Sequence, residues 1–180
     1  MENGYRIKLL KQHQQPDWDK THGCPTIAQL ARLFKVKKMA EVGAAYGHTA
    51  TEVLDKAHIV QYYMIDVWSK EEIYQTIIHS FGDDSRVVIL RKDSILAAKD
   101  FNNESLDMVY LDTYHNYNQT VKEIHAWIKK VKRGGILVGD GYGYKVDGKE
   151  QVKRAVHEIF NNEQINVNLG KDYIYWIMRP

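Results

Sequence analysis

The sequence predicts an α/β fold in which helices cover both faces of an open, mostly parallel sheet. Short apolar runs alternate along the chain with segments whose apolar residues recur at helical spacing, a pattern typical of strands joined by right-handed crossovers. The central apolar runs are uninterrupted rather than alternating, as in strands that are buried on both faces. Prolines occur only at Pro16, Pro25 and Pro180, so the interior contains no residue that would break these elements.

Seven segments are short apolar runs of the kind that forms buried strands. The first five are separated from one another by helical patterns. The last two follow each other with little sequence between them, which predicts one antiparallel addition at an edge of the sheet. The predicted strands are 37–44, 58–66, 85–93, 106–112, 134–140, 164–169 and 172–178.

Helical patterns fill most of the sequence between these strands. Thr26 is placed to cap a first helix, whose apolar face ends at Phe34. The segment 117–133 has an apolar face and ends in four basic residues, which suit the negative end of a helix dipole. The other predicted helical segments are 50–57, 69–80, 95–99 and 152–160.

Length and composition fit one domain, which we take as residues 1–180 with 1–22 as an N-terminal extension. A formal net charge of +2 is too small to argue for nucleic acid by itself. The single cysteine, Cys24, excludes an internal disulfide and fits a reducing compartment. No run approaches the roughly 18 apolar residues of a membrane span, and residues 1–20 lack the apolar core of a signal peptide. We therefore expect a cytoplasmic location and no membrane partner.

Acidic residues stand at the predicted carboxyl ends of four strands. They are Asp66, Asp93, Asp112 and Asp140, and Glu41 lies just before the turn that follows the first strand. Because parallel strands end at the same edge of a sheet, the fold brings these carboxylates to one rim, where such sheets bind ligands. A rim of carboxylates repels a polyphosphate and suits a ligand with hydroxyls, an exocyclic amine and a positive centre.

The turn after the first strand reads Gly43-Ala44-Ala45-Tyr46-Gly47. A dinucleotide fingerprint has a glycine at the middle position as well. The turn therefore argues against NAD, whose pyrophosphate needs the full pattern. Gly43 and Gly47 are expected to let the backbone approach a ligand closely, because a side chain there would take the ligand's space.

S-adenosylmethionine carries the groups that this rim would recognise. Asp66 lies 23 residues after Gly43 and is placed to accept hydrogen bonds from both ribose hydroxyls. Asp93 and Ser94 are placed to accept from the adenine amine, and Glu41 is expected to face the ammonium group of the amino acid tail. The set predicts S-adenosylmethionine as the cofactor.

Four motifs give the sequence a resemblance to the class I S-adenosylmethionine-dependent methyltransferases over about residues 22–160. It is most similar to the branch that contains catechol O-methyltransferase and the small sugar and macrolide O-methyltransferases. The motifs are EVGAAYGHTA at the first strand, MIDVW at the second, SLDMVYLDTYHNY at the fourth and VKRGGILVGDGYG at the fifth. The resemblance implies a cofactor site made of Glu41, Gly43, Ala45, Gly47, Thr49, Asp66, Trp68, Asp93, Ser94 and Asp112.

The resemblance also implies a Rossmann-like, doubly wound sheet of seven strands with the last one antiparallel. The implied reaction is in-line methyl transfer to an oxygen of a small hydroxylated molecule, with the protein positioning the reactants and removing a proton. In this branch Mg²⁺ often holds the acceptor hydroxyls. Asp112 and Asp140 stand at two ligand positions, but the third is Gly141, which has no side chain. Either the two carboxylates hold Mg²⁺ with waters and substrate, or the metal is lost and they accept hydrogen bonds.

His115 is the candidate catalytic base, acting with Asp112, because it lies three residues after that acid, where catechol O-methyltransferase has a lysine base. A neutral imidazole accepts a proton near pH 7. The alternative interpretation is a structural hydrogen bond that closes the loop. Tyr114 and Tyr117 either line the acceptor pocket or only pack, and Trp68 either lies over the adenine or covers the sheet edge.

Other functions share this fold. A cofactor-binding module or partner subunit without catalysis agrees with the missing side chain at Gly141, but not with the intact Asp112, His115 and Asp140. An RNA methyltransferase would use the basic runs at 35–38 and 128–133, the second of which also has a helix-end explanation. A nicotinamide dehydrogenase is disfavoured by the missing glycine and the acidic rim.

The acceptor itself is not specified by the motifs, so catechols, sugars and other small hydroxylated molecules all stay open. The segment 1–15 is too short for the multi-helix cap that encloses the substrate in many relatives. This predicts an acceptor site that is open or is completed by a second subunit in a homodimer.

Overall fold

The computed structural model describes residues 23–162 and 165–180. The N-terminal extension predicted at 1–22 and the first residue of the strand predicted at 164–169 lie outside the described residues.

The strands form one sheet of seven in the order β3-β2-β1-β4-β5-β7-β6. Strands β1 to β5 are parallel, and β7 runs antiparallel to both of its neighbours, β5 and β6. This arrangement confirms the predicted doubly wound, Rossmann-like sheet with an antiparallel last strand. The strands are β1 (Lys38–Val42), β2 (Gln61–Asp66), β3 (Val87–Arg91), β4 (Leu106–Leu111), β5 (Val131–Gly139), β6 (Asn168–Leu169) and β7 (Tyr175–Met178).

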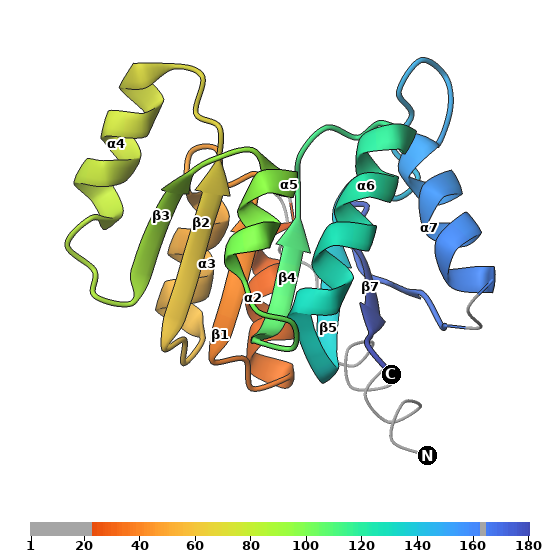
Figure 1. The fold of residues 1–180 in the computed structure, drawn as a ribbon, viewed down its shortest axis with the longest axis horizontal. Coiled ribbons are helices and arrows are strands. Elements are labelled where there is room, and N and C mark those ends of the chain that lie inside the picture. Colours follow the sequence, from red (N-terminus) through yellow and green to blue (C-terminus); the bar gives the residue numbers. More distant parts are fainter. Residues whose placement is uncertain (1–22, 163–164) are drawn as a thin grey trace.

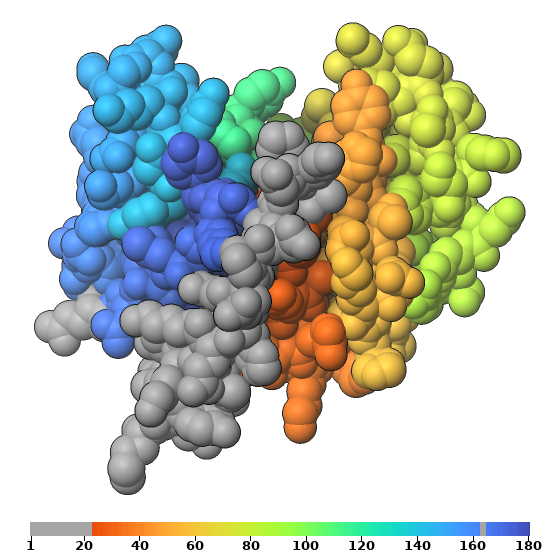
Figure 2. Space-filling view, turned by 180° about the vertical axis from the view of Figure 1, so that it is seen from behind, coloured from red at the N-terminus to blue at the C-terminus, as the bar shows by residue number. Residues whose placement is uncertain are grey.

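Helices cover both faces of the sheet (Figure 1). One layer contains α2, α3 and α4, and its Ile27, Val53 and Ile77 belong to one buried cluster with Met39 of the sheet. Figure 2 shows this layer from behind, with α3 in orange beside α4 in yellow-green. The other layer contains α5, α6 and α7. The helices are α2 (Cys24–Leu33), α3 (His48–Lys56), α4 (Glu71–Phe81), α5 (Ser94–Ala97), α6 (Tyr117–Trp127) and α7 (Gln151–Asn162), with 3₁₀ turns at Ala98–Asp100 and Ile128–Lys130.

The uninterrupted apolar runs arise because both faces of each central strand are buried. In β4, Met108 and Tyr110 belong to the layer of α2 and α3, whereas Val109 and Leu111 belong to the layer of α5, α6 and α7. Each fully buried side chain of this kind stabilises the fold by about 1.5–3 kcal/mol. The sheet is therefore a rigid central layer, and its carboxyl edge holds the functional groups.

The end of α6 differs from the prediction. The helix ends at Trp127, and β5 begins at Val131, which pairs with Leu106. The helix predicted over 117–133 is therefore too long. Of the basic residues after it, Lys132 contacts the start of β4, where it forms an ion pair with Asp107 at 2.7 Å.

The edge strand β6 is shorter than predicted and pairs only through Asn168 and Leu169. A short strand at an open edge limits the unpaired backbone that is exposed there. Separately, none of the helices within 23–162 and 165–180 is long and apolar enough to cross a membrane.

Candidate active site

A cavity of about 260 Å³ opens at the carboxyl ends of β1, β2 and β4, at the upper edge of the sheet in Figure 1. Strand β1 has β2 on one side and β4 on the other, so the strand order reverses between β1 and β4. Open α/β sheets bind ligands at the carboxyl edge of such a topological switch point. Of the predicted cofactor set, six residues line this cavity: Gly43, Ala45, Asp66, Asp93, Ser94 and Asp112. Four do not line it: Glu41, Gly47, Thr49 and Trp68.

Asp66, the last residue of β2, holds the glycine turn in place. Its Oδ2 accepts from the Ala45 N–H at 3.0 Å and its Oδ1 from the Trp68 N–H at 2.8 Å. The Trp68 indole N–H closes the loop by donating to the Ala45 carbonyl at 2.8 Å. Trp68 is only 3% exposed, so its ring supports the turn from within the protein instead of facing the cavity.

The two glycines of the turn are required by the protein's own packing. A Cβ on Gly43 would lie 1.8 Å from the Asp112 carbonyl oxygen, and one on Gly47 would lie 2.5 Å from the Phe81 ring. Both have positive φ, at 95° and 78°. The structure therefore gives both glycines a packing reason, and the expected space for a ligand stays a prediction.

Glu41 faces the helix layer. Side chains alternate along a strand, so Glu41 shares a face of β1 with Met39 and points toward α2 and α3. It is 2% exposed and accepts a hydrogen bond from the Tyr62 hydroxyl at 2.8 Å. Burial, with a smaller contribution from the charge of Asp112, raises the pKa of Glu41 to about 8 against the lowering effect of the Tyr62 hydrogen bond.

Asp93 and Ser94 stand where the end of β3 enters α5. Oδ1 of Asp93 caps this short helix by accepting from the N–H groups of Ile95 and Leu96 at 2.9 and 3.0 Å. The Ser94 hydroxyl donates to Glu123 of α6 at 2.6 Å. One oxygen of Asp93 is therefore engaged in capping, while Ser94 joins a second network on the cavity wall.

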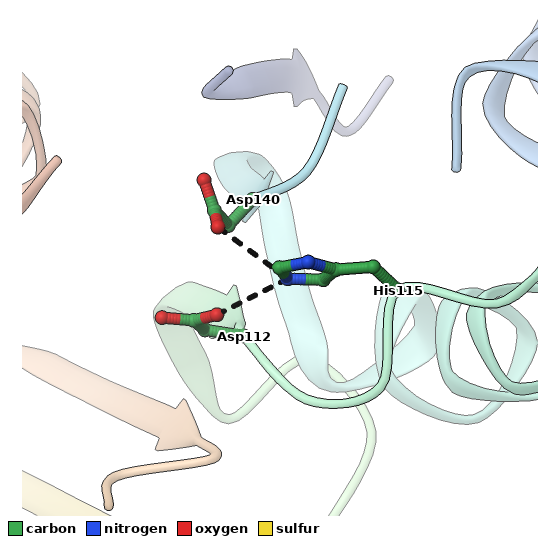
Figure 3. A group of neighbouring side chains, drawn as sticks. All are labelled: Asp112, His115 and Asp140. Carbon is green, nitrogen blue, oxygen red and sulfur yellow. Dashed lines mark hydrogen bonds and ion pairs between the residues drawn. The ribbon is translucent and has the colours of Figure 1, made fainter. Parts of the chain in front are cut away.

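His115 lies between two carboxylates at the ends of β4 and β5 (Figure 3). Its Nε2 is 3.4 Å from Asp112 Oδ1 and 3.4 Å from Asp140 Oδ2. The hydroxyl of Tyr110, which is buried, donates to the other oxygen of Asp112 at 3.1 Å. The structure thus brings together the predicted base and both predicted metal ligands.

Electrostatics in this group favour a shared proton near neutral pH. The hydrogen bond to Asp112 raises the pKa of His115 above its usual 6.5, and the charge of Asp140 acts in the same direction against burial. Burial, together with the charge of Asp112, raises the pKa of Asp140 to about 6. A proton held at Nε2 therefore interacts with both acids.

The three side chains also have the composition of a cation site, since one donor atom from each of them lies within 4.8 Å of the others. The carboxylates of Asp112 and Asp140 suit Mg²⁺, which prefers oxygen ligands and keeps several waters. The imidazole of His115 does not suit Mg²⁺, because nitrogen ligands favour transition metals. Gly141 adds no ligand, so the two acids are the residues that fit Mg²⁺.

A comparison with protein-family models decides the family. Residues 40–142, which contain the glycine turn, the cavity and the group around His115, match the model of the methyltransferase domain. The chain belongs to this family. It is an S-adenosylmethionine-dependent methyltransferase. No curated protein sequence matches the chain.

Solved structures show that this methyltransferase has a widely used fold. A putative caffeoyl-CoA O-methyltransferase from Staphylococcus aureus is 17% identical, with a TM-score of 0.72 over 97% of this chain and 92% of that one. An SAH-bound methyltransferase from Podospora anserina is 14% identical, with a TM-score of 0.68 over 98% and 87%. An N-methyltransferase from Bradyrhizobium japonicum is 17% identical, with a TM-score of 0.61 over 90% and 98%. Neighbours that are named for oxygen and for nitrogen transfer share the fold, so the fold does not decide the acceptor atom.

Sequence reasoning missed seven residues that line the methyltransferase cavity, which are Val42, Ile65, Val67, Lys92, Thr113, Gln119 and Glu123. Val67 lines it and is 50% exposed beside Asp66, and Gln119 and Glu123 of α6 line its far wall. A signal for the last two was present. They are spaced i, i+4 on a helix, so they share one face, and Glu123 directly precedes the buried Ile124.

Proposed function

We propose that this methyltransferase transfers the methyl group of S-adenosylmethionine to an oxygen of a small hydroxylated acceptor bound at the carboxyl rim of the sheet. The observation that carries this proposal is the position of His115, held between Asp112 and Asp140 beside the cavity. A base in this place is needed when the acceptor is a hydroxyl, because the oxygen must lose its proton as the methyl group arrives.

The cavity supports a defined orientation of the cofactor. Asp66 would accept from the ribose hydroxyls, since each of its oxygens keeps a lone pair after accepting one backbone N–H. The adenine ring of the cofactor would then lie toward Asp93 and Ser94, and its amino acid tail toward the Gly43 turn. Because the Glu41 carboxyl is engaged with Tyr62, Asp112 is the acid that faces the tail from the cavity wall.

The proposed chemistry is a direct displacement. The acceptor oxygen forms a bond to the methyl carbon, the sulfur–carbon bond breaks, and its electron pair stays on sulfur to give S-adenosylhomocysteine. In the tautomer with its proton at Nε2, between the two carboxylates, His115 would keep the lone pair of Nδ1 to accept the proton of the hydroxyl. The protein otherwise acts by positioning, because the cofactor supplies the electrophile.

A bound Mg²⁺ would be held by Asp112 and Asp140. It would supply positive charge next to the acceptor hydroxyl and so favour its ionisation. The alternative is that both acids act only as hydrogen-bond acceptors for His115 and the acceptor.

A small acceptor is favoured over RNA by the location of the basic residues. Lys132 pairs with Asp107, and Arg133 lies 3.7 Å from Glu104, both at the start of β4 and β5. That end of the sheet is opposite the cavity. These two positive charges are therefore paired with carboxylates and do not surround the proposed methyl-transfer site.

Calorimetry with S-adenosylmethionine and S-adenosylhomocysteine tests the cofactor site. Asp66→Ala should lower the affinity for both ligands by at least about 10-fold, because it removes the ribose acceptor and the anchor of the turn. Asp83→Ala, an exposed acid after α4, is the matched control and should bind normally. Unchanged affinity in Asp66→Ala would refute the ribose assignment.

Methyl transfer to a panel of catechols, sugars and other hydroxylated compounds tests the reaction, with and without a chelator. If the wild-type protein forms methylated product and His115→Ala does not, the result supports His115 as the general base. Activity that survives chelation removes Mg²⁺ from the mechanism, whereas transfer to amines alone would contradict the oxygen acceptor.

A further inference from the structure

The far wall of the cavity is organised by one buried carboxylate. Glu123 of α6 is 2% exposed and accepts three side-chain hydrogen bonds. Its Oε1 accepts from Ser94 Oγ at 2.6 Å and from Gln119 Nε2 at 2.8 Å, and its Oε2 accepts from Thr113 Oγ1 at 2.7 Å. All four residues line the cavity, so this network borders the space where a ligand binds.

The network fixes the orientation of the Gln119 amide. A carboxylate only accepts hydrogen bonds, so the side of the amide that meets Glu123 has to be the NH₂ group. This group also donates to Ser94 Oγ at 3.3 Å, so both of its hydrogens are used. The carbonyl oxygen of Gln119 has no hydrogen-bond partner within the described part of the chain.

The two hydroxyls at this wall are oriented by the same carboxylate. The hydroxyl groups of Ser94 and Thr113 each have a single hydrogen, and each donates it to Glu123. The nearby ammonium of Lys92 is engaged by Asp100 at 2.7 and 2.9 Å. The side chains of Ser94, Thr113, Gln119 and Glu123 therefore offer the cavity lone pairs and no free hydrogen-bond donors.

We propose that Glu123 is a positioning residue that makes this wall an acceptor surface and thereby selects a 6-aminopurine nucleoside over a 6-oxopurine one. This inference rests on the proposed function, in which the purine of the cofactor lies toward Ser94. A 6-amino group donates two hydrogens to such a wall, with the Gln119 carbonyl as the oxygen that lacks a partner. A 6-oxo group places a lone pair against lone pairs and leaves the wall unsatisfied.

The test compares two ligands by calorimetry: S-adenosylhomocysteine and S-inosylhomocysteine, which differ at position 6 of the purine and in the proton at N1. The wild-type protein should bind the adenosyl compound at least about 30-fold more tightly, as expected for a lost hydrogen bond together with an opposed acceptor pair. Similar affinities for both ligands would overturn the inference and leave the proposed function intact. Binding of neither would refute the cofactor site itself.

Glu123→Gln is the decisive variant because it keeps the size of the side chain and adds an NH₂ donor. Where the new NH₂ faces Thr113, it donates to that hydroxyl and frees the hydroxyl hydrogen; where it faces Gln119, the Gln119 amide turns its own NH₂ toward the cavity. In either orientation the wall gains a hydrogen-bond donor. The preference for the adenosyl ligand should fall at least about 10-fold, mainly through tighter binding of the inosyl ligand. Glu72→Gln, an exposed position on α4, is the matched control and should keep the wild-type ratio.

A second variant keeps the inference testable if Glu123→Gln does not fold. Gln119→Leu removes the carbonyl acceptor from a half-buried position while keeping a side chain of similar volume. It should weaken binding of the adenosyl ligand and leave binding of the inosyl ligand nearly unchanged, so that the ratio of the two affinities approaches one. A merely structural role would weaken both ligands equally, and that result would overturn the inference.

Discussion

The imidazole of His115 occupies the space that a side chain at Gly141 would need. A Cβ at that position would lie 2.9 Å from Cγ and 3.0 Å from Cδ2 of the ring. The absence of a side chain at residue 141 therefore leaves the space in which His115 packs between the two carboxylates. Residue 141 can carry a side chain only if the ring moves.

Gly141→Ala should consequently reduce methyl transfer at least about 10-fold, because the added Cβ displaces the base from Asp112 and Asp140. The substitution also places an L-residue at a φ of 80°, which costs about 1–2 kcal/mol of stability. Steady-state kinetics should show the loss mainly in kcat, since Gly141 is not among the residues that line the proposed cofactor cavity.

Gly148→Ala separates the two effects. Gly148 has a φ of 73°, but nothing lies within 4 Å of the position of its Cβ. This variant should lose a similar amount of stability by thermal unfolding and keep its activity. Equal activity losses in both variants would mean that backbone strain, and not the His115 contact, explains the Gly141 result.

The pH profile of methyl transfer should report the environment of His115. An imidazolium has no lone pair for the acceptor proton, so the rate should fall as the pH drops through the pKa of this residue. Asp112 and Asp140 raise that pKa, so the midpoint of the acid limb should lie above 6.5. Asp140→Asn removes one negative neighbour and should move the midpoint to lower pH. An acid limb that stays in place would assign it to another group.

The sequence was sufficient for the sheet and for the acids at its rim, because both follow from periodicity of the strands. Asp66 and Asp112 directly end or follow apolar runs, so their place at the carboxyl edge required no side-chain detail. The orientation of Glu41 could not be predicted from its place before the glycine turn alone. This residue lies inside β1, where alternation sends it to the face of Met39 and into the helix layer. Strand position, rather than nearness to the glycine turn, decides where its carboxyl points.

The wall around Glu123 depends on a contact between elements that lie far apart in sequence. Ser94 and Glu123 are 29 residues apart, and their hydrogen bond forms only when α6 packs beside α5. Trp68 is a similar case, because its indole donates to a carbonyl 23 residues earlier. A pattern along one strand or helix contains no information on such pairs. The boundary between α6 and β5 was misplaced for the same reason, since the Leu106 pairing that starts β5 is tertiary.

Glu41 should make the stability of the protein fall as pH rises. Its pKa is raised from 4.5 to about 8 in the folded state, so the folded protein holds this proton more tightly than the unfolded chain does. The contribution is fully present below 4.5 and is lost as the pH rises through 8. Glu41→Gln has no proton to lose and keeps a carbonyl for the Tyr62 hydroxyl. Denaturant unfolding should therefore show the variant gaining on the wild type between pH 5 and 8. A constant difference across that range would contradict the raised pKa.

Trp68→Phe should weaken cofactor binding while leaving the fold intact. Phenylalanine keeps an aromatic ring in the buried position but removes the N–H that donates to the Ala45 carbonyl. Ala45 is at a φ of 42°, so its turn loses one of the contacts that hold a strained backbone beside the cavity. We expect an affinity loss of roughly 5-fold to 10-fold for S-adenosylhomocysteine, the effect of one net hydrogen bond of about 1 kcal/mol. Trp127→Phe is the control, because the indole N–H of this buried tryptophan has no hydrogen-bond partner in the described chain. If calorimetry gave the same loss for both variants, ring volume rather than the bond to Ala45 would explain it.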